Sequence, residues 1–236
     1  MVTPSRGKDI TIYDDGMSKQ FAVIGMGRVG ASLVRTLEAL GHDVLGLDCD
    51  EDLIQDLSLE LPRAHLITAD VTESMVLRDL GLEHFDGAAV VIGESIQASV
   101  LVTLILKDLG VPLIIARANS PLHARVLERV GADYVVQPEK EFGEFLARRM
   151  SSPGILDYLE LGQDEALVEM KAPGEWIGKS LADLNLHRKK GLTVLAIKGE
   201  GKEGAIPRPE APLKEGDVLV IGGPKKELDK LDPSAE

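Results

Sequence analysis

The sequence contains a single cysteine, Cys49, among 236 residues. One cysteine can form neither an internal disulfide nor a zinc site built from cysteines, and it fits a reducing compartment. Aromatic residues make up only 3% of the chain, which leaves few side chains for the stacking platforms that single-stranded nucleic acids need. Positive charge is also scarce, because 26 Lys and Arg stand against 39 Asp and Glu, for a net charge of −13. So acidic a surface repels phosphate backbones, and we expect no nucleic-acid partner.

Long hydrophobic runs are missing as well. The longest uncharged apolar stretch, residues 95–106, has 12 residues, whereas a membrane-spanning helix needs about 20. The first 20 residues contain no apolar core of the length found in signal peptides. We therefore expect a cytoplasmic protein that does not cross a bilayer by itself. Residues 1–19 lack hydrophobic periodicity, which predicts a flexible N-terminal arm.

What the sequence does contain is a regular alternation of short apolar strands and helices. This alternation predicts crossover units and a parallel sheet with helices on both faces. Six strands in about 120 residues are the size of a doubly wound, Rossmann-like α/β domain that binds nucleotides. The strands are predicted at 21–24, 44–47, 64–68, 88–92, 113–116 and 134–136.

The regular alternation of strands and helices ends after a further helix, which is predicted at 139–150. Ser151-Ser152-Pro153-Gly154 is a break typical of a boundary, so we predict a nucleotide-binding domain at 20–150 and a second domain at 151–236. The second domain is expected to be a small α+β module. Its strands are predicted at 155–161, 166–171, 192–197 and 218–221, and its helices at 180–188 and 225–231.

Gly25, Gly27 and Gly30 fit the pattern G-x-G-x-x-G between the first predicted strand and helix. The motif alone is weak, but Asp48 ends the second predicted strand 23 residues after Gly25, near the spacing of a carboxylate that binds a ribose. In this motif the first glycine permits a tight turn, the second admits a phosphate, and the third lets the helix pack on the sheet. The pattern predicts a nucleotide site, with a tight turn that binds no ligand as the alternative.

The acidic residues around this motif have two interpretations each. Asp48 favours a ribose with a free 2′-hydroxyl over NADP, but it could instead cap the next helix, a role that Asp50 could also fill. Asp70 follows the third predicted strand and could border an adenine pocket or cap the helix after it.

Arg28 stands between the second and third glycines. A dinucleotide does not need it, because backbone N–H groups bind the pyrophosphate. An arginine offers a forked, permanently charged donor to a phosphate beyond the β position, and a cation at a helix N-terminus is unfavourable without an anion. We predict that Arg28 makes the site a switch between ATP and ADP; a solvated residue in the first helical turn is the alternative.

The sequence resembles the regulatory subunits of potassium uptake channels, the KtrA/TrkA family, which is built from RCK domains. The stretches that carry the resemblance up to residue 150 are F-A-V-I-G-M-G-R-V-G, G-H-D-V-L-G-L-D, V-V-I-G-E-S-I-Q-A-S, V-L-E-R-V-G-A-D and Q-P-E-K. It continues through K-S-L-A-D-L-N, T-V-L-A-I-K and G-D-V-L-V-I-G. The resemblance implies a cytoplasmic gating ring, usually an octamer assembled from dimers, beneath a membrane subunit of the KtrB or TrkH type.

The resemblance also implies that ATP or ADP binds in the Rossmann lobe. It places Arg28 and Arg117 at the phosphates, Asp48 and Asp50 at the ribose and Asp70 near the base. Relatives often carry Asn at the last two positions, so the preference for base or ribose could differ. The nucleotide-binding residues it implies are Gly25, Met26, Gly27, Arg28, Val29, Gly30, Asp48, Cys49, Asp50, Asp70, Val71, Ile92, Gly93, Glu94 and Arg117.

Two further sites follow from the resemblance alone. Glu139 is expected near the phosphates of a neighbouring subunit, where the family can place a cation such as Mg²⁺ or Na⁺. Relatives can bind cyclic di-AMP between two copies of the second domain. The matching residues here are Asn185, His187, Arg188 and Pro207, and His187 stands where the family expects a more basic side chain.

An NAD(H)-dependent dehydrogenase or redox sensor on the same fold is the competing function. A dehydrogenase needs an acid–base group that faces the nicotinamide. The second predicted domain contains one histidine, His187, and the five histidines of the chain show no metal-ligand spacing. We therefore expect a protein without enzymatic activity.

Overall fold

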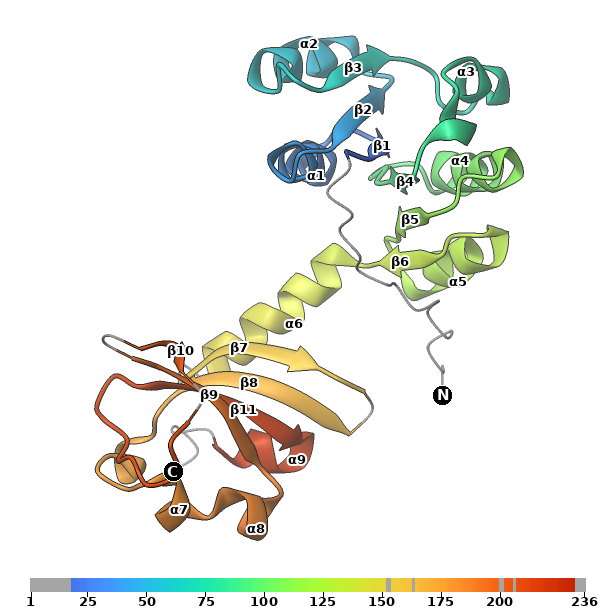
Figure 1. The fold of residues 1–236 in the computed structure, drawn as a ribbon. Helices are drawn as coiled ribbons and strands as arrows, with labels where there is room; N and C mark the ends of the chain where they lie inside the picture. The colour runs from blue at the N-terminus through green and yellow to red at the C-terminus, as the bar shows by residue number, and fades with distance from the viewer. Residues whose placement is uncertain (1–17, 152–153, 163, 200–201, 206, 232–236) are drawn as a thin grey trace. The chain divides into compact units, whose positions relative to one another are not determined.

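The structure is a computed structural model that describes residues 18–151, 154–162, 164–199, 202–205 and 207–231 (Figure 1). Its chain divides into two compact units, Met1–Pro138 and Glu139–Glu236. The predicted arm lies outside the described residues up to position 17. The division falls twelve residues before the predicted boundary at 150, so that helix α6 (Pro138–Ser151) groups with the second unit.

The first unit contains a six-stranded sheet in the order β3-β2-β1-β4-β5-β6. Every neighbouring pair is parallel, which confirms the doubly wound, Rossmann-like fold. The strand order reverses between β1 and β4, and ligands of such sheets bind beyond the carboxyl ends of the strands at this point. The strands are β1 (Gln20–Ile24), β2 (Asp43–Asp48), β3 (His65–Thr68), β4 (Gly87–Val90), β5 (Ile114–Arg117) and β6 (Tyr134–Val136).

Helices cover both faces of this sheet because successive side chains of each strand point to opposite sides. Val23 belongs to a buried cluster with α1 and α2, whereas Ala22 and Ile24 belong to another with α3, α4 and α5. Asp50, Ser95 and Ser120 cap α2, α4 and α5 with side-chain hydrogen bonds. The helices are α1 (Arg28–Ala39), α2 (Glu51–Glu60), α3 (Ser74–Asp79), η1 (Leu82–His84), α4 (Ile96–Leu109) and α5 (Pro121–Val130).

The second unit is built on a five-stranded antiparallel sheet in the order β10-β9-β11-β8-β7. It has its own buried core, centred on side chains such as Met170, Trp176 and Leu219. The sheet and its short helices confirm the small α+β module. The strands are β7 (Ile155–Glu160), β8 (Glu165–Lys171), β9 (Thr193–Gly199), β10 (Lys202–Ala205) and β11 (Val218–Pro224). The remaining helices are η2 (Gly174–Trp176), α7 (Leu181–Leu184), α8 (Leu186–Lys190), α9 (Lys225–Leu228) and η3 (Asp229–Leu231).

The single helix predicted at 180–188 is wrong, because the chain forms α7 and α8 with Asn185 between them. Asn185 has a φ of 49° in the left-handed region, a conformation that ends an α-helix and that asparagine tolerates better than most residues. The second strand after residue 191, β10 (Lys202–Ala205), was also not predicted.

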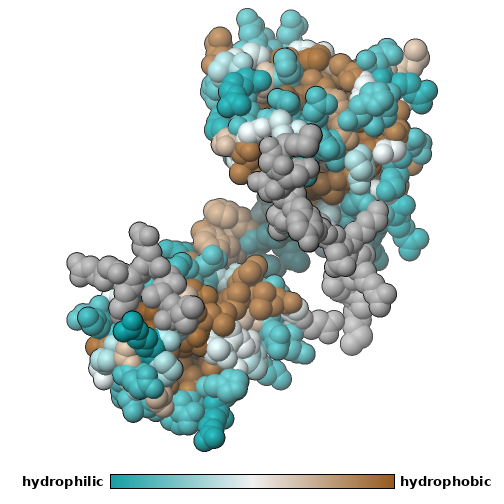
Figure 2. All heavy atoms as spheres, in the orientation of Figure 1, coloured by the Kyte–Doolittle hydropathy of each residue, from teal (hydrophilic) through white to brown (hydrophobic). Residues whose placement is uncertain are grey.

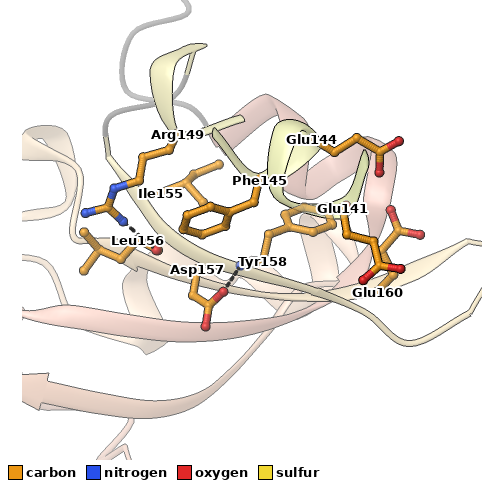
Figure 3. Close-up of a pocket in the computed structure, with 9 residues that line it drawn as sticks. All are labelled: Glu141, Glu144, Phe145, Arg149, Ile155, Leu156, Asp157, Tyr158 and Glu160. Carbon is orange, nitrogen blue, oxygen red and sulfur yellow. Dashed lines mark hydrogen bonds between the residues drawn. The ribbon is translucent and has the colours of Figure 1, made fainter. Parts of the chain in front are cut away.

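Helix α6 packs on β7 within the second unit, as Figure 3 shows. The ring of Phe145 lies over Ile155 and beside Tyr158 in this view. Arg149 Nη1 donates a hydrogen bond to the carbonyl oxygen of Leu156 at 2.7 Å. The residues drawn line a cavity of about 180 Å³.

Large apolar side chains interrupt the polar surface of both units, and Figure 2 shows them as brown areas among teal. On α4, Ile96, Leu101 and Leu104 are exposed, and on α6 Phe142 and Met150 are exposed. Across the described ranges, we find no helix that is both long enough and apolar enough to span a membrane.

Candidate nucleotide-binding site

A pocket of about 660 Å³ opens in the first unit, at the carboxyl ends of β1 to β5. Every predicted nucleotide-binding residue lines it except Met26 and Gly30. Sequence reasoning missed six lining residues, which are Leu47, Leu53, Thr72, Val91, Ser95 and Ala98. Ser95 caps α4, and Ala98 lies in its first turn. A serine directly after Glu94 is a typical helix cap, and this was the one feature of the sequence that could have predicted that α4 begins at the pocket. Leu47, Leu53 and Val91 are apolar and carry no chemistry that marks a site, and no pattern in the sequence marks the Thr72 hydroxyl.

The three glycines of the loop between β1 and α1 have different roles. Gly25 has a φ of +99°, and a Cβ there would lie 2.9 Å from the backbone nitrogen of Ile92. A Cβ on Gly30 would collide with the carbonyl oxygen of Gly25 and lie 3.0 Å from its carbonyl carbon. A Cβ on Gly27 would have nothing within 4 Å, and Gly27 lines the pocket. The fold therefore requires Gly25 and Gly30, whereas Gly27 keeps open the space that a ligand would enter.

Asp48 accepts hydrogen bonds from two backbone N–H groups at the pocket. Its Oδ2 accepts a hydrogen bond from the N–H of Met26 at 2.6 Å, and its Oδ1 accepts one from the N–H of Asp50 at 3.1 Å. The Met26 side chain is fully buried, so Met26 contributes its backbone to the site rather than its side chain. Asp50, and not Asp48, caps α2, because Asp50 Oδ1 accepts from the N–H of Leu53 at 3.1 Å. Asp48 thus joins the glycine loop to the end of β2 and keeps further lone pairs for a ligand.

Asp70 and Cys49 border the pocket near the ends of β3 and β2. Asp70 Oδ1 accepts hydrogen bonds from the Thr72 hydroxyl at 2.6 Å and from the Thr72 N–H at 3.0 Å. These bonds lower the pKa of Asp70. The cap residue of α3 is Glu73, so the alternative in which Asp70 caps that helix is wrong. Partial burial and the neighbouring Asp48 raise the pKa of Cys49, which leaves a neutral thiol beside a carboxylate at neutral pH.

Replacing Thr72 by valine is expected to raise the pKa of Asp70 toward the ordinary value of an aspartate. The hydroxyl donates the shorter of the two hydrogen bonds that stabilise the charged carboxylate. Carboxyl chemical shifts followed by NMR during an acid titration measure the change, and Thr72→Ser is the control that keeps the hydroxyl. Because the pKa is lowered in the folded state, this contribution to stability is present above the ordinary pKa and is lost as the pH falls through the lowered one. Equal pKa values in wild type and Thr72→Val would contradict the assignment.

Two arginines bring positive charge to the pocket. Arg28 is the first residue of α1, and no acidic residue occupies the first turn of that helix. Arg117 ends β5, and its Nη1 would lie 3.1 Å from a Cβ at Gly93, so the guanidinium lies close to the Gly93 backbone. Helices α1 and α4 also begin at the pocket, so their N-termini lie there. Helix N-termini attract anions. The pocket therefore combines two guanidinium groups and two helix N-termini at one part with carboxylates at the ends of β2 and β3.

The other predicted sites lie in the second unit. Glu139 is exposed in the first turn of α6, and within the described ranges no three His, Cys, Asp or Glu side chains are grouped to hold a metal ion. His187 Nδ1 lies 3.2 Å from Thr193 Oγ1, and Arg188 is exposed. The N–H of Ala182 donates to the carbonyl oxygen of Pro209 at 2.9 Å, which brings the chain after Pro207 beside α7. The roles of Glu139, Asn185, His187, Arg188 and Pro207 stay predictions.

Comparison with known proteins agrees with the resemblance. The family model described as the TrkA-N domain matches residues 21–138, and the TrkA-C domain matches residues 166–234. The Ktr system potassium uptake protein A of Bacillus subtilis is 40% identical over 215 residues, which cover 91% of this chain and 96% of that protein. The chain belongs to the TrkA family. Ktr system potassium uptake protein C of the same organism is 39% identical to this TrkA-family chain, over 92% of this chain and 97% of the relative.

Solved structures share the fold of this TrkA-family chain. A structure described as the GsuK channel has a TM-score of 0.68 and 23% sequence identity, and one described as the GsuK channel bound to NAD has a TM-score of 0.67 and 21% identity. The matches cover 92% and 91% of this chain but 39% of each channel chain. The chain thus spans less than half the length of these channels.

Proposed function

We propose that this chain is the nucleotide-sensing regulatory subunit of a potassium uptake system, in which ATP or ADP bound in the first unit controls a membrane subunit that conducts the ion. The observation that carries the proposal is the pocket at the reversal of strand order, where the glycine loop, Asp48, Arg28 and Arg117 converge. The 40% identity to a Ktr potassium uptake protein over most of both chains supports the potassium system. The role is regulatory rather than catalytic.

The pocket suits a nucleotide from base to phosphate. The N–H groups at the start of α1 and the two guanidinium groups bind the phosphates. The oxygens of Asp48, already oriented by two backbone N–H groups, accept hydrogen bonds from the ribose hydroxyls. Asp70 borders the base. ATP and ADP regulate the membrane subunit only if they bind two conformations of the assembly with different relative affinities.

The assembly and its location are the finer parts of the proposal. Dimers associate into an octameric ring, which docks beneath a membrane subunit of the KtrB or TrkH type at the cytoplasmic face of the membrane. Exposed apolar side chains on α4 and α6 support self-association. Apolar surface of this kind is typical of an interface with another protein chain. Glu139 holds a cation such as Mg²⁺ or Na⁺ near a neighbouring subunit's phosphates, and the second unit binds cyclic di-AMP around Asn185; both rest on the resemblance.

NAD(H) is the competing ligand. Asp48 suits a ribose with a free 2′-hydroxyl in either nucleotide, and a channel that shares this fold is described as bound to NAD. The presence of Arg28 favours ATP or ADP, because a pyrophosphate bound by backbone N–H groups does not need a guanidinium.

Isothermal titration calorimetry of the whole chain with ATP, ADP and NAD⁺ tests the proposal. We expect ATP and ADP to bind, and Asp48→Ala to weaken both by about 10-fold or more, since bonds to a charged group contribute about 1.5–3 kcal/mol. Asp56→Ala on the exposed side of α2 is the matched control and should bind as wild type does. Binding of NAD⁺ with no binding of ATP or ADP would overturn the proposal and restore the redox alternative.

A further inference from the structure

A side chain that the sequence did not single out joins two loops of the pocket. Asn119 follows β5, and its Nδ2 donates a hydrogen bond to the carbonyl oxygen of Gly93 at 2.6 Å. Gly93 follows β4, and both Gly93 and Arg117 line the pocket. The strands β4 and β5 are paired up to Val90 and Ala116, and the Asn119 bond extends this connection to the loop residues beside the Arg117 guanidinium, which lies close to the Gly93 backbone. Loss of the bond would remove this connection between the two loops.

Asn119 is itself held by His123 of α5. His123 Nδ1 accepts a hydrogen bond from the N–H of Asn119 at 3.2 Å. His123 is 3% exposed, and burial lowers the pKa of its imidazole, so the ring is neutral at pH 7. Since Nδ1 accepts, the ring proton is on Nε2. Within the described part of the chain, Nε2 is buried without a hydrogen-bond partner.

The buried Nε2 of His123 indicates that the imidazole is not there to stabilise the core. A buried donor without an acceptor lowers stability, so an apolar side chain would fill the same space at less cost. The cap of α5 does not need the ring either, because the backbone N–H of His123 donates to Ser120 Oγ at 3.2 Å. Among the residues that the structure describes, the one hydrogen bond of the imidazole is the bond to Asn119.

We propose that His123 and Asn119 are positioning residues of the nucleotide site. His123 orients the backbone of Asn119, and the Asn119 amide fixes Gly93, so that the Arg117 guanidinium faces the phosphates of the bound nucleotide. The inference rests on the proposed function, because it assumes a nucleotide in this pocket. It adds a second layer of residues, on the loop after β5 and the first turn of α5, to those that line the pocket.

The first test is Asn119→Ala in the whole chain, with ADP as the titrant. Removing one hydrogen bond that orients the phosphate end is expected to weaken ADP binding by about 3- to 10-fold. Asp86→Ala is the matched control, because Asp86 Oδ2 accepts from the N–H of Gln20 at 2.8 Å and connects β1 and β4 at their amino ends, whereas the pocket lies at the carboxyl ends of the strands. It should lower the melting temperature and leave ADP affinity unchanged.

The second test separates positioning from a structural role of the histidine. His123→Leu removes the acceptor and should weaken ADP binding, whereas His123→Asn, whose amide oxygen can occupy the position of Nδ1, should restore it. If His123 acts through Asn119, the double variant Asn119→Ala/His123→Leu binds ADP no more weakly than Asn119→Ala alone.

Unchanged ADP affinity in Asn119→Ala would overturn the inference, and that exposed variant is expected to fold. Additive losses in the double variant, or equal ADP affinities of His123→Leu and His123→Asn, would overturn the part assigned to His123. A wild-type chain that binds neither ATP nor ADP would instead overturn the proposed function, so the two failures are distinguishable.

Discussion

Gly30→Ala is expected to destabilise the first unit by about 3 kcal/mol or more, at the upper end of the cost of overpacking. The added Cβ would collide with the carbonyl oxygen of Gly25, which is backbone and cannot rotate away as a side chain can. The Gly25 N–H donates to the carbonyl oxygen of Leu47 at 2.8 Å, so any shift of the loop also breaks its contact with β2. Urea unfolding followed by circular dichroism measures the loss.

Gly27→Ala is the matched control in the same loop. Its Cβ would meet nothing within 4 Å, and its φ of −60° suits an alanine. We expect it to unfold at the same urea concentration as wild type but to bind nucleotide more weakly, because the methyl group points into space that a phosphate would approach. A Gly30→Ala chain as stable as wild type would show that the loop can move in a way that the structure does not indicate.

Arg28→Ala is expected to lower the affinity for ATP by about 10- to 100-fold and that for ADP by no more than about 3-fold. Hydrogen bonds between charged groups contribute about 1.5–3 kcal/mol, and the guanidinium is predicted to meet a phosphate beyond the β position. Arg28→Lys should recover part of the loss, since it keeps the charge but not the fork. Calorimetry with both nucleotides measures the difference.

The control on the same helix is Arg35→Ala. Arg35 pairs with Glu60 at 3.1 Å, with both side chains more than half exposed, and such a pair contributes about 0–1 kcal/mol. We expect no change in nucleotide affinity. In a reconstituted system, activation of potassium uptake by ATP should fail in Arg28→Ala, given that allosteric coupling is usually about 5- to 150-fold. Unchanged affinities together with normal activation would exclude Arg28 as the switch.

The sequence by itself determined the sheet of the first unit and most of the pocket. The strands are short continuous apolar runs and the helices have an apolar period of about 3.6 residues, and both are local properties of the chain. The carboxyl ends of parallel strands meet at one edge, so the loops after 24, 47, 68, 92 and 116 had to converge. This is why Asp48, Asp70, Gly93 and Arg117 line one pocket although they are far apart in sequence.

Only the tertiary structure decided which partner each polar side chain takes. The backbone N–H of Met26 donates to Asp48, while the Met26 side chain is buried in the core. Asn119 reaches Gly93, 26 positions earlier, and no periodic pattern marks such a pair. Asn185 breaks a helix that its neighbours favour. Hydrogen bonds between loops depend on strand register and on the path of each turn, and these are fixed by packing across the sheet rather than by the residues of one segment.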